Sequence, residues 1–353
     1  MSLRPIYGHD ALLNRLAGAL ATSRFPQATL FTGAPGVGKQ RLALWVAQGL
    51  LCETGPGEPC GECSGCRQVL RLAHPDLHWF VPIPRPKAGD PDKQVDEAQE
   101  ILAAAIEERR QNPLWQRPDR MSSHSLATAR LLHRLVWMTP FSGDRKVIVV
   151  GDAERLVVQE ASQEAANALL KVLEEPPDDT TIILTAADPE RLLPTIRSRL
   201  VTLRIPRVAD DEVRRFLGQE LDPPLKGKPL ERRALLAEGS IGRALWAEGE
   251  AEGPDRRAAQ LLEAVGNNGA EGWAAATLAQ LPWAARGDFT ALLDALAVRL
   301  RAGLEEAASS EDTSLAGRLE ALRCVEETRA SAQGNVNPQL ALAVLAGDLE
   351  RLL

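Results

Sequence analysis

Two short apolar runs with a helical stretch between them stand out in the hydrophobic pattern of the chain. The runs, Val147 to Val150 and Thr181 to Leu184, are unbroken, which is typical of strands buried on both faces of a sheet. From Gln159 to Glu175 apolar residues recur at helical spacing, and Pro176-Pro177 follows as a stop. A strand, a helix and a strand in this order predict a parallel crossover unit.

A further short strand, predicted at residues 28–32, runs into a glycine-rich loop of sequence GAPGVGKQ. The loop has the GxxxxGK spacing of a phosphate-binding loop, in which backbone N–H groups turn toward phosphate oxygens. A glycine-rich turn that only begins a helix is the alternative interpretation. We predict a degenerate nucleotide site, and its candidate residues are Gly33, Gly36, Gly38, Lys39, Gln40, Asp152 and Arg243.

Positions around this loop lack the side chains that phosphoryl transfer requires. Gln40 stands where a serine or threonine would hold magnesium, and Gly151-Asp152 stands where an Asp-Glu pair would bind the metal and position water. Ala186-Ala187 follows the second strand, where a polar side chain would sense the γ-phosphate. Asp152 or Glu154 could substitute for the missing acids, but both could equally be solvated acids at the end of a strand. The site could still bind ATP or ADP, and we expect it to hydrolyse neither.

Four of the five cysteines are clustered between positions 52 and 66, with the spacing C-x7-C-x2-C-x2-C. Turn-forming residues separate them, and four thiolates at short range suit the tetrahedral geometry of structural zinc. His74 and His78 are close in sequence, but four cysteines already complete the ligand shell. Because only Arg67 and Arg71 add positive charge nearby, we predict that the module braces the fold and does not read DNA. The predicted zinc ligands are Cys52, Cys60, Cys63 and Cys66.

The pattern divides the chain into three predicted domains. Residues 1–206 form an α/β core that contains the four-cysteine module and an inserted, proline-rich segment at about 80–125. Residues 207–250 form a lid of short helices, and a linker at 248–255, rich in Glu, Gly and Pro, leads to an all-helical domain at 255–353. The helices expected outside the crossover unit span residues 9–23, 41–51, 95–110, 126–137, 210–217, 230–237, 239–245, 289–305, 315–328 and 337–352.

Composition and charge limit the function without defining it. Hydrophobic residues make up 44% of the chain and charged residues 25%, as in ordinary globular proteins. The net charge of −7 counts against a strong nucleic-acid binder, because phosphate neutralisation needs clustered Lys and Arg. No apolar run has membrane-spanning length, and the sequence MSLRPIYGHD carries no apolar core of a signal peptide. We therefore expect a cytoplasmic protein without a membrane partner.

The combination of a phosphate loop, a four-cysteine module after its helix and helical domains that follow resembles the clamp-loader family of bacterial DNA polymerase III, a group of AAA+ proteins. The resemblance spans nearly the whole chain apart from the inserted segment. It implies an α/β P-loop AAA+ domain with a parallel sheet and an inserted zinc module, followed by a small helical lid and an all-α collar domain. The segments that carry it are residues 52–66, His74-Pro75-Asp76, residues 165–177, Asp188-Pro189 and residues 193–199.

Within this family, motor subunits keep the complete set of ATPase residues, whereas delta-prime subunits are inert. The departures at Gln40, Gly151 and Ala186 make this chain resemble the delta-prime subunits. The resemblance implies an accessory subunit of the polymerase holoenzyme that is no ATPase alone. Its partners would be motor subunits and a delta-like subunit in a hetero-oligomeric ring, which loads the sliding clamp onto primer-template DNA. It also implies that Arg199 reaches a neighbour's ATP as a trans arginine finger, with Ser198 orienting its loop.

Three alternatives stay open. Arg199 could form an ion pair on the surface of its own domain instead, and the family's Ser-Arg-Cys triplet reads Ser-Arg-Leu here. The chain could be a working ATPase, either a gamma/tau-like motor subunit or another AAA+ switch, with Asp152 and Glu154 rescuing the magnesium site. It could also be a zinc-dependent nucleic-acid-binding module that uses an inactive phosphate loop as a scaffold.

Overall fold

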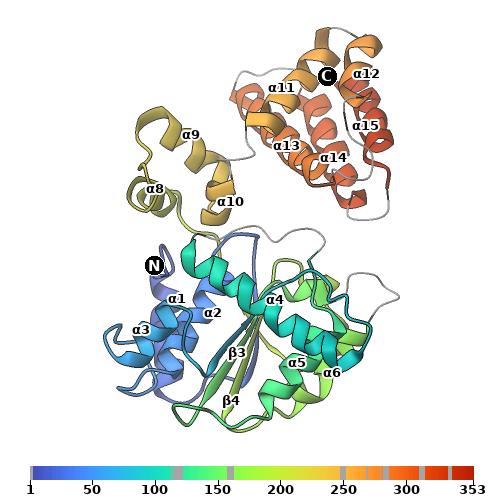
Figure 1. The fold of residues 1–353 in the computed structure, drawn as a ribbon. Helices are drawn as coiled ribbons and strands as arrows, with labels where there is room; N and C mark the ends of the chain where they lie inside the picture. The colour runs from blue at the N-terminus through green and yellow to red at the C-terminus, as the bar shows by residue number, and fades with distance from the viewer. Residues whose placement is uncertain are drawn as a thin grey trace. The chain divides into compact units, whose positions relative to one another are not determined.

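The computed structural model describes residues 3–112, 114, 122–156, 163–246, 252–267, 269–278, 280, 286–309, 315–332 and 336–353 (Figure 1). The chain divides into two compact units, residues 1–245 and residues 246–353. Each unit has a hydrophobic core of its own. Within the described residues, every helix is too short or too polar to cross a membrane.

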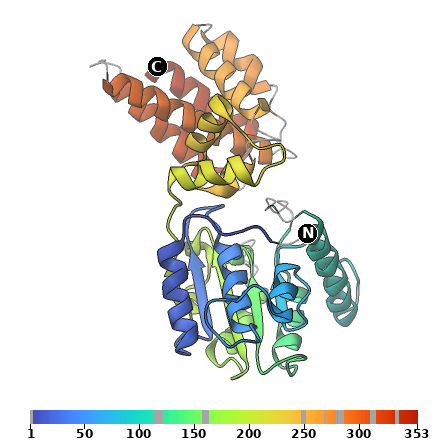
Figure 2. The same cartoon turned by 90° about the vertical axis from the view of Figure 1, so that its left-hand side faces the viewer.

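A five-stranded sheet forms the centre of the first unit. Neighbouring strands all pair in parallel, in the order β2-β3-β4-β1-β5. Helices lie on both sides of the sheet (Figures 1 and 2). The strands β1, β3 and β4 are therefore buried along their whole length. The five strands are β1 Ala28–Thr32, β2 Leu77–Phe80, β3 Lys146–Val150, β4 Thr180–Ala186 and β5 Val201–Arg204.

The predicted crossover unit is confirmed. β3 and β4 pair in parallel with Val147 opposite Thr181, and α6 (Glu164–Glu174) lies between them in sequence. The apolar stripe of α6, which includes Leu169 and Val172, is buried against the core. Residues 159–162, the first part of the predicted helix, lie outside the described residues. Because β1 pairs in parallel on the other side of β4, the carboxyl ends of all three strands meet at one edge of the sheet.

Other helices of this unit follow the predicted apolar spacing closely. In α1, for example, Leu12, Leu16 and Leu20 are buried on one face. The helices are α1 Asp10–Ala21, α2 Lys39–Leu50, α3 Ser64–Leu70, α4 Pro91–Gln111, α5 Leu126–Val136, α7 Pro194–Arg197, α8 Asp210–Gln219, α9 Gly227–Ala237 and α10 Ile241–Trp246, with short 3-10 turns η1 Ala153–Leu156 and η2 Pro189–Arg191.

The inserted segment contains a longer helix than the sequence predicts. The expected start of α4 at residue 95 is wrong, because the helix begins at Pro91. Asp90 caps it by accepting hydrogen bonds from the backbone N–H groups of Asp92 and Lys93. Proline suits the first helical position because its missing N–H would have no helical partner there. The two strands at the edges of the sheet, β2 and β5, were not predicted either, since both are short and partly exposed.

A smaller apolar cluster joins α8, α9 and α10 after β5. Val213, Phe216 and Ala234 are buried in it. Tyr7, from the start of the chain, packs edge-on against Phe216 with ring centroids 5.4 Å apart. Leu114, which follows α4 within the inserted segment, also contacts this cluster. The short helices thus pack together as a group that both the N-terminus and the inserted segment touch.

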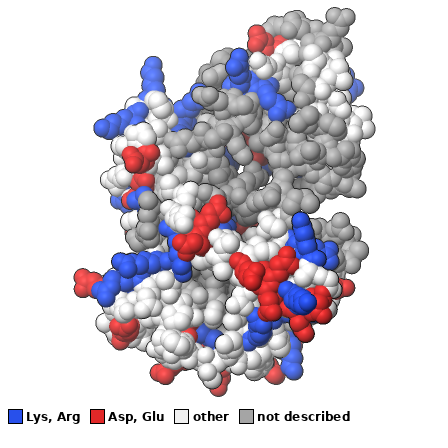
Figure 3. Space-filling view, in the orientation of Figure 1, with Lys and Arg blue, Asp and Glu red and all other residues white. Residues whose placement is uncertain are grey.

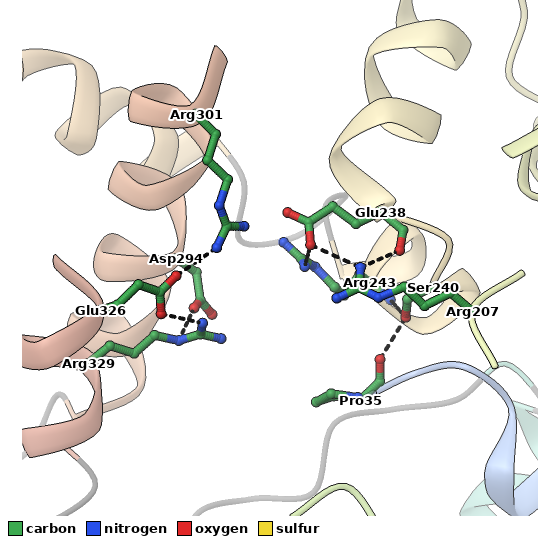
Figure 4. Close-up of polar contacts among 9 residues, drawn as sticks. All are labelled: Pro35, Arg207, Glu238, Ser240, Arg243, Asp294, Arg301, Glu326 and Arg329. Atoms are coloured by element: carbon green, nitrogen blue, oxygen red, sulfur yellow. Dashed lines mark hydrogen bonds and ion pairs between the residues drawn. The ribbon is translucent and has the colours of Figure 1, made fainter. Parts of the chain in front are cut away.

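The second unit is a bundle of helices around buried leucines such as Leu293 and Leu345. Asn337 caps the last helix by accepting hydrogen bonds from two backbone N–H groups. The linker prediction is wrong over residues 252–255, which form the first turn of a helix. Ion pairs such as Arg329 with Asp294 at 2.8 Å join two of the helices (Figure 4). The helices are α11 Glu252–Asn267, α12 Gly269–Leu278, α13 Arg286–Ser309, α14 Leu315–Ser331 and α15 Pro338–Leu352.

Candidate nucleotide site, arginine finger and zinc module

The phosphate loop lies at the carboxyl end of β1, where the chain turns into α2. Gly36 and Gly38 have φ angles of 78° and 96°, in the left-handed region that favours glycine. Lys39 is buried, and its Nζ donates hydrogen bonds of 2.9 Å to the carbonyl oxygens of Gly33 and Ala34. The strand–loop–helix context predicted for a phosphate loop is therefore present. The carbonyl groups of the loop itself accept the hydrogen bonds of Lys39.

Gln40 holds its carboxamide between two neighbours. Its Oε1 accepts a hydrogen bond from Trp79 Nε1 at 3.2 Å, and its amide donates to the carboxylate of Asp152. The carboxamide also covers Gly151, where an added Cβ would come within 2.5 Å of Gln40 Oε1. Gln40 therefore fills the space between α2 and the end of β3, which is where an active phosphate-loop enzyme holds magnesium.

Asp152 and Glu154 follow β3 and are directed into the protein. Glu154 is only 9% exposed, and its Oε1 accepts a hydrogen bond from the N–H of Ala187 at 3.1 Å. Burial raises the pKa of both carboxyl groups, and the charge of Asp152 raises the pKa of Glu154 further. Burial also lowers the pKa of Lys39, and the negative charges of these two carboxylates oppose that shift. The alternative that Asp152 and Glu154 are solvated acids is therefore wrong.

The start of α10 rests directly on the phosphate loop. Ser240 Oγ donates to the carbonyl oxygen of Pro35 at 2.7 Å (Figure 4). The N–H of Gly242 donates to the carbonyl oxygen of Gly36 at 2.9 Å. A Cβ added at Gly36 would lie 2.5 Å from Ser240 Oγ. Glycine is thus required here by close backbone approach as well as by its φ angle.

Arg243 belongs to the same turn, but its side chain is bound elsewhere. Its backbone N–H donates to Ser240 Oγ at 3.3 Å, whereas its guanidinium pairs with Glu238 at 2.7 Å. Arg207 pairs with the same carboxylate at 3.1 Å (Figure 4). Arg243 would have to leave Glu238 to reach a phosphate group, and its role in nucleotide binding stays a prediction.

His124 supports the floor of this site from the end of the inserted segment. It is 2% exposed, and its Nε2 donates to the carbonyl oxygen of Gly151 at 2.7 Å. Burial lowers the pKa of His124 from 6.5 to about 4. The unfolded chain therefore binds a proton between those pH values that the folded chain does not, so stability is lost as the pH falls through this window.

We expect this single histidine to destabilise the protein by about 3 kcal/mol between pH 7 and pH 4. The measurement is chemical denaturation of the wild type and of His124→Gln over this range. The substitution keeps a donor for Gly151 and removes the titration. The difference in unfolding free energy between the two proteins should move in favour of the variant as the pH falls. A difference that does not depend on pH would contradict the prediction.

Arg199 follows α7, and Ser198 ends that helix. The Arg199 guanidinium donates to Glu174 Oε2 at 3.1 and 3.2 Å and to the carbonyl oxygen of Thr195 at 2.8 Å. Ser198 is exposed, and its hydroxyl donates to the same carbonyl oxygen at 3.2 Å. In this single chain, Arg199 thus makes an ion pair on its own domain. Glu174 is 59% exposed, so water screens this pair and limits it to about 1 kcal/mol or less.

The four predicted zinc ligands converge. Their Sγ atoms all lie within 4.8 Å of one another. The Sγ of Cys52 is 3.6 Å from that of Cys60 and 3.9 Å from that of Cys63, and the Sγ atoms of Cys60 and Cys66 are 3.9 Å apart. Zinc bound to four sulfurs at about 2.3 Å places the sulfurs about 3.8 Å from one another. Both the donor set and the spacing therefore fit a closed, structural zinc site.

Backbone groups around this cluster suit thiolate ligands. The N–H of Cys63 donates to Cys60 Sγ at 3.4 Å, and the N–H of Cys66 donates to Cys63 Sγ at 3.3 Å. Such bonds favour the charged sulfur and lower the pKa of the Cys60 thiol to about 6. Gly65 allows the module to approach the end of α2, because a Cβ there would collide with the carbonyl oxygen of Leu51. The module is therefore packed onto the helix of the phosphate loop.

The segment His74-Pro75-Asp76 links the module to the sheet. His74 is not part of the sulfur cluster, and its Nδ1 accepts a hydrogen bond from the N–H of Asp76 at 3.1 Å. The Asp76 carboxylate accepts hydrogen bonds from the N–H groups of Phe141 and Ser142, at 2.5 and 2.9 Å. Those bonds lower the pKa of Asp76 despite its burial. His74 is thus a structural residue, as the sequence predicted.

Sequence reasoning missed four side chains that contact the predicted positions. Trp79, Arg109 and His124 come from β2 and the inserted segment, whose contacts have no signature in local sequence. Arg109 lies with its Cζ 5.5 Å from the centre of the Trp79 ring. Glu174 lies in the LEEPP stretch at the end of α6, and a search for acids there would have found it as the partner of Arg199.

The strand order, with a phosphate loop after β1 and a crossover from β3 to β4, defines a P-loop protein of the AAA+ class. A family model described as DNA polymerase III, delta subunit, matches residues 8–209. The chain belongs to this family, and the resemblance to the bacterial clamp-loader proteins is confirmed.

Individual relatives agree with this assignment. The chain is 31% identical over 258 residues to subunit delta' of DNA polymerase III from Pseudomonas aeruginosa, covering 72% of this chain and 64% of that protein. It is 29% identical over 244 residues to subunit tau from Escherichia coli, covering 68% of this chain and 31% of that protein. The matched region is thus less than two thirds of the length of either relative. A gamma-subunit-related structure from Thermotoga maritima covers 97% of this chain and 98% of its own, at 16% identity and a TM-score of 0.46.

Proposed function

We propose that this chain is a delta-prime-like subunit of the bacterial replicative clamp loader, which helps load the sliding clamp onto primed DNA. In this proposal residues 1–206, 207–250 and 255–353 act as AAA+ core, lid and collar, and the partners are motor subunits and a delta-like subunit in a hetero-oligomeric ring. The chain does not hydrolyse ATP itself. It contributes Arg199 to the ATP site of a neighbouring motor subunit, with Ser198 orienting the loop.

The observation that carries this proposal is the packing of Gln40 against Gly151. An ATPase of this class needs magnesium between the phosphate loop and the end of β3. The Gln40 carboxamide fills that space and is hydrogen-bonded in it. Ala186 closes β4 with no polar side chain for the γ-phosphate. The similarity to both delta' and tau chains supports a clamp-loader role without separating an inert subunit from a motor.

A gamma/tau-like motor subunit is the second candidate, and the match to tau favours it. Glu154, which is buried, and Asp152, which is half-buried, are the groups that could rescue a metal site. Each has a buried carboxylate oxygen that lacks a hydrogen-bond partner among the described residues. Burial raises the pKa of both carboxyl groups, and the positive charge of Lys39 opposes that rise. We favour the inert subunit because Gln40 stands in the place that the metal would need.

A nucleic-acid-binding role for the chain by itself has less support. The α4 helix carries more acidic than basic residues, and Figure 3 shows a group of acidic side chains with basic ones among them. Such a surface repels the phosphate backbone. The zinc module adds no basic cluster, so we propose that it is a brace. The acidic residues of α4 are Asp92, Asp96, Glu97, Glu100, Glu107 and Glu108.

The test is ATP hydrolysis by the purified, zinc-loaded chain with Mg²⁺, alongside Lys39→Ala. We expect no turnover above that of the Lys39→Ala control, because the magnesium position is filled. Turnover that disappears in Lys39→Ala would overturn the inert subunit and establish the motor subunit. The Lys39 control separates activity of this loop from a contaminating ATPase.

A further inference from the structure

Magnesium, which the P-loop class implies, does not fit the residues of this site. Gln40 and Gly151 each replace a residue that would hold the metal, and the structure shows that the two replacements depend on one another. A Cβ at Gly151 would lie 2.5, 2.7 and 2.9 Å from the Oε1, Cδ and Nε2 atoms of Gln40. Side-chain carbons do not approach other heavy atoms so closely without displacing them. A side chain at position 151 would therefore force the Gln40 carboxamide out of its present position.

The Gln40 carboxamide is fixed in its position. Trp79 Nε1 donates to its oxygen at 3.2 Å, and its nitrogen donates to Asp152. Gln40 is 8% exposed and Trp79 is 9% exposed, so water does not compete freely for these bonds. Displacing the carboxamide to admit a metal ion would leave the Trp79 N–H without its partner in a buried setting, which is costly.

Positive charge is also built into this site. Arg109, in the last turn of α4, stacks over the Trp79 ring with its Cζ 5.5 Å from the ring centre. Its charge favours the ionised form of Asp152, as do the charges of Lys39 and Arg155. The charges of three cations of the protein thus act on the carboxylate that would otherwise attract a divalent metal ion. Repulsion from these groups adds to the steric exclusion by Gln40.

We propose that this is a magnesium-excluding site, in which Gln40 occupies the place of the metal ion, Gly151 makes room for Gln40, and Arg109 of the inserted segment supplies fixed positive charge. The inference deepens the proposed function by giving the reason for absent hydrolysis, and it rests on the inactive-site part of that function alone. It also gives the inserted segment a role, because Arg109 and the ring it covers connect that segment to the phosphate-loop helix.

The direct test uses Mn²⁺ as a paramagnetic probe. The zinc-loaded full chain is labelled with 5-fluorotryptophan, and the Trp79 resonance is assigned by comparison with Trp79→Phe. Mn²⁺ is then added at millimolar concentration together with ATP. A metal ion bound between α2 and β3 would be close to Trp79 and would broaden its ¹⁹F signal. We expect no broadening in the wild type, and broadening in the double variant Gln40→Thr/Gly151→Asp, which restores the usual metal-binding side chains.

Each outcome of this test decides the proposal. Broadening of the Trp79 signal in the wild type overturns it, because metal then binds despite Gln40. Absence of broadening in both proteins also overturns it, because Gln40 is then not what excludes the metal. This result is separate from the clamp-loader role, whose failure appears only in experiments on the assembly with its partners.

A double-mutant cycle tests the dependence of Gly151 on Gln40 without any ligand. We expect Gly151→Ala to lower the Tm of the wild type by about 5 °C, because the new Cβ meets the carboxamide. In the Gln40→Ala background the same substitution should leave the Tm nearly unchanged. Equal shifts in the two backgrounds would show that the residues are independent and would contradict the proposed coupling.

The part played by Arg109 is measured in the Gln40→Thr/Gly151→Asp background. Adding Arg109→Met should tighten Mn²⁺ binding by about tenfold, because one repelling charge is removed. Arg110→Met is the matched control, since Arg110 points to the carbonyl oxygen of Leu72, to which its Nη2 donates at 2.7 Å. The control should leave Mn²⁺ binding unchanged. Equal effects of the two substitutions would remove Arg109 from the proposal.

Discussion

Arg199→Ala is expected to reduce ATP turnover at the neighbouring motor subunit by about a thousandfold when the chain is assembled with its proposed partners. A rate loss of this size is typical of removing a trans arginine, because that arginine stabilises the negative charge of the phosphoryl group during transfer. Because only one interface is affected, the total ATPase rate of the assembly should fall only by the fraction of the rate that this one site contributes. The measurement is DNA-stimulated ATP hydrolysis of the reconstituted assembly, with the amount of assembly checked by gel filtration.

Folding and assembly should survive this substitution. The Arg199 pair with Glu174 is exposed and contributes little stability. Arg197→Ala is the matched control, because Arg197 is the last residue of α7, close to Arg199 in sequence, and pairs with Glu190 at 2.6 Å. It should leave the rate unchanged. If Arg199→Ala also leaves the rate unchanged, Arg199 serves only the ion pair on its own domain.

Glu174→Gln separates the two roles of Arg199 further. Arg199 must leave Glu174 to reach a neighbour's phosphate group, so the carboxylate competes with the proposed function. Removing its charge should not lower the ATPase rate of the assembly. A loss as large as that of Arg199→Ala would mean instead that the pair itself is what the assembly needs.

Sequence alone predicted the central part of the fold because its signals are local. The runs at β3 and β4 are apolar on both faces, and only a buried parallel sheet requires that pattern. The helix expected at 337–352 is likewise observed as α15, and its start has a local signal in Asn337 as the cap and Pro338 in the first helical position. The edge strands β2 and β5 escaped prediction because each is short and partly polar, and they exist through pairing with β3 and β1. Pairing between distant segments has no local signature.

The candidate site was likewise predictable from the sequence only in part. The four cysteines carry their chemistry and their spacing together, so the sequence predicted a cluster that the structure brings within one ligand shell. By contrast, the sequence showed Gln40 and Gly151 only as two separate losses. Their contact, and the burial of Glu154, depend on how α2 packs against the end of β3. Those relations come from tertiary packing, and only coordinates reveal them.

Removal of zinc is expected to unfold the four-cysteine module and lower the Tm of the chain by about 10 °C or more. Four thiolates without a metal ion would repel one another at distances near 3.9 Å, and protonating them costs the stabilisation that zinc provides. The effect should extend beyond the module, because Gly65 packs it against the carbonyl oxygen of Leu51 at the end of the phosphate-loop helix. Chelation with a strong zinc ligand, followed by calorimetry and metal analysis, measures this loss.

Cys63→Ser should reproduce the loss by removing one ligand, whereas Cys324→Ser is the matched control. Cys324 lies on α14, is partly buried against the core of the second unit and is not part of the sulfur cluster. It should leave both the zinc content and the Tm nearly unchanged. The same samples decide between a brace and a DNA reader, because each predicts a different loss. A chelated chain that stays folded with an unchanged Tm, and loses only affinity for primed DNA, would show that the module binds DNA and does not brace the fold.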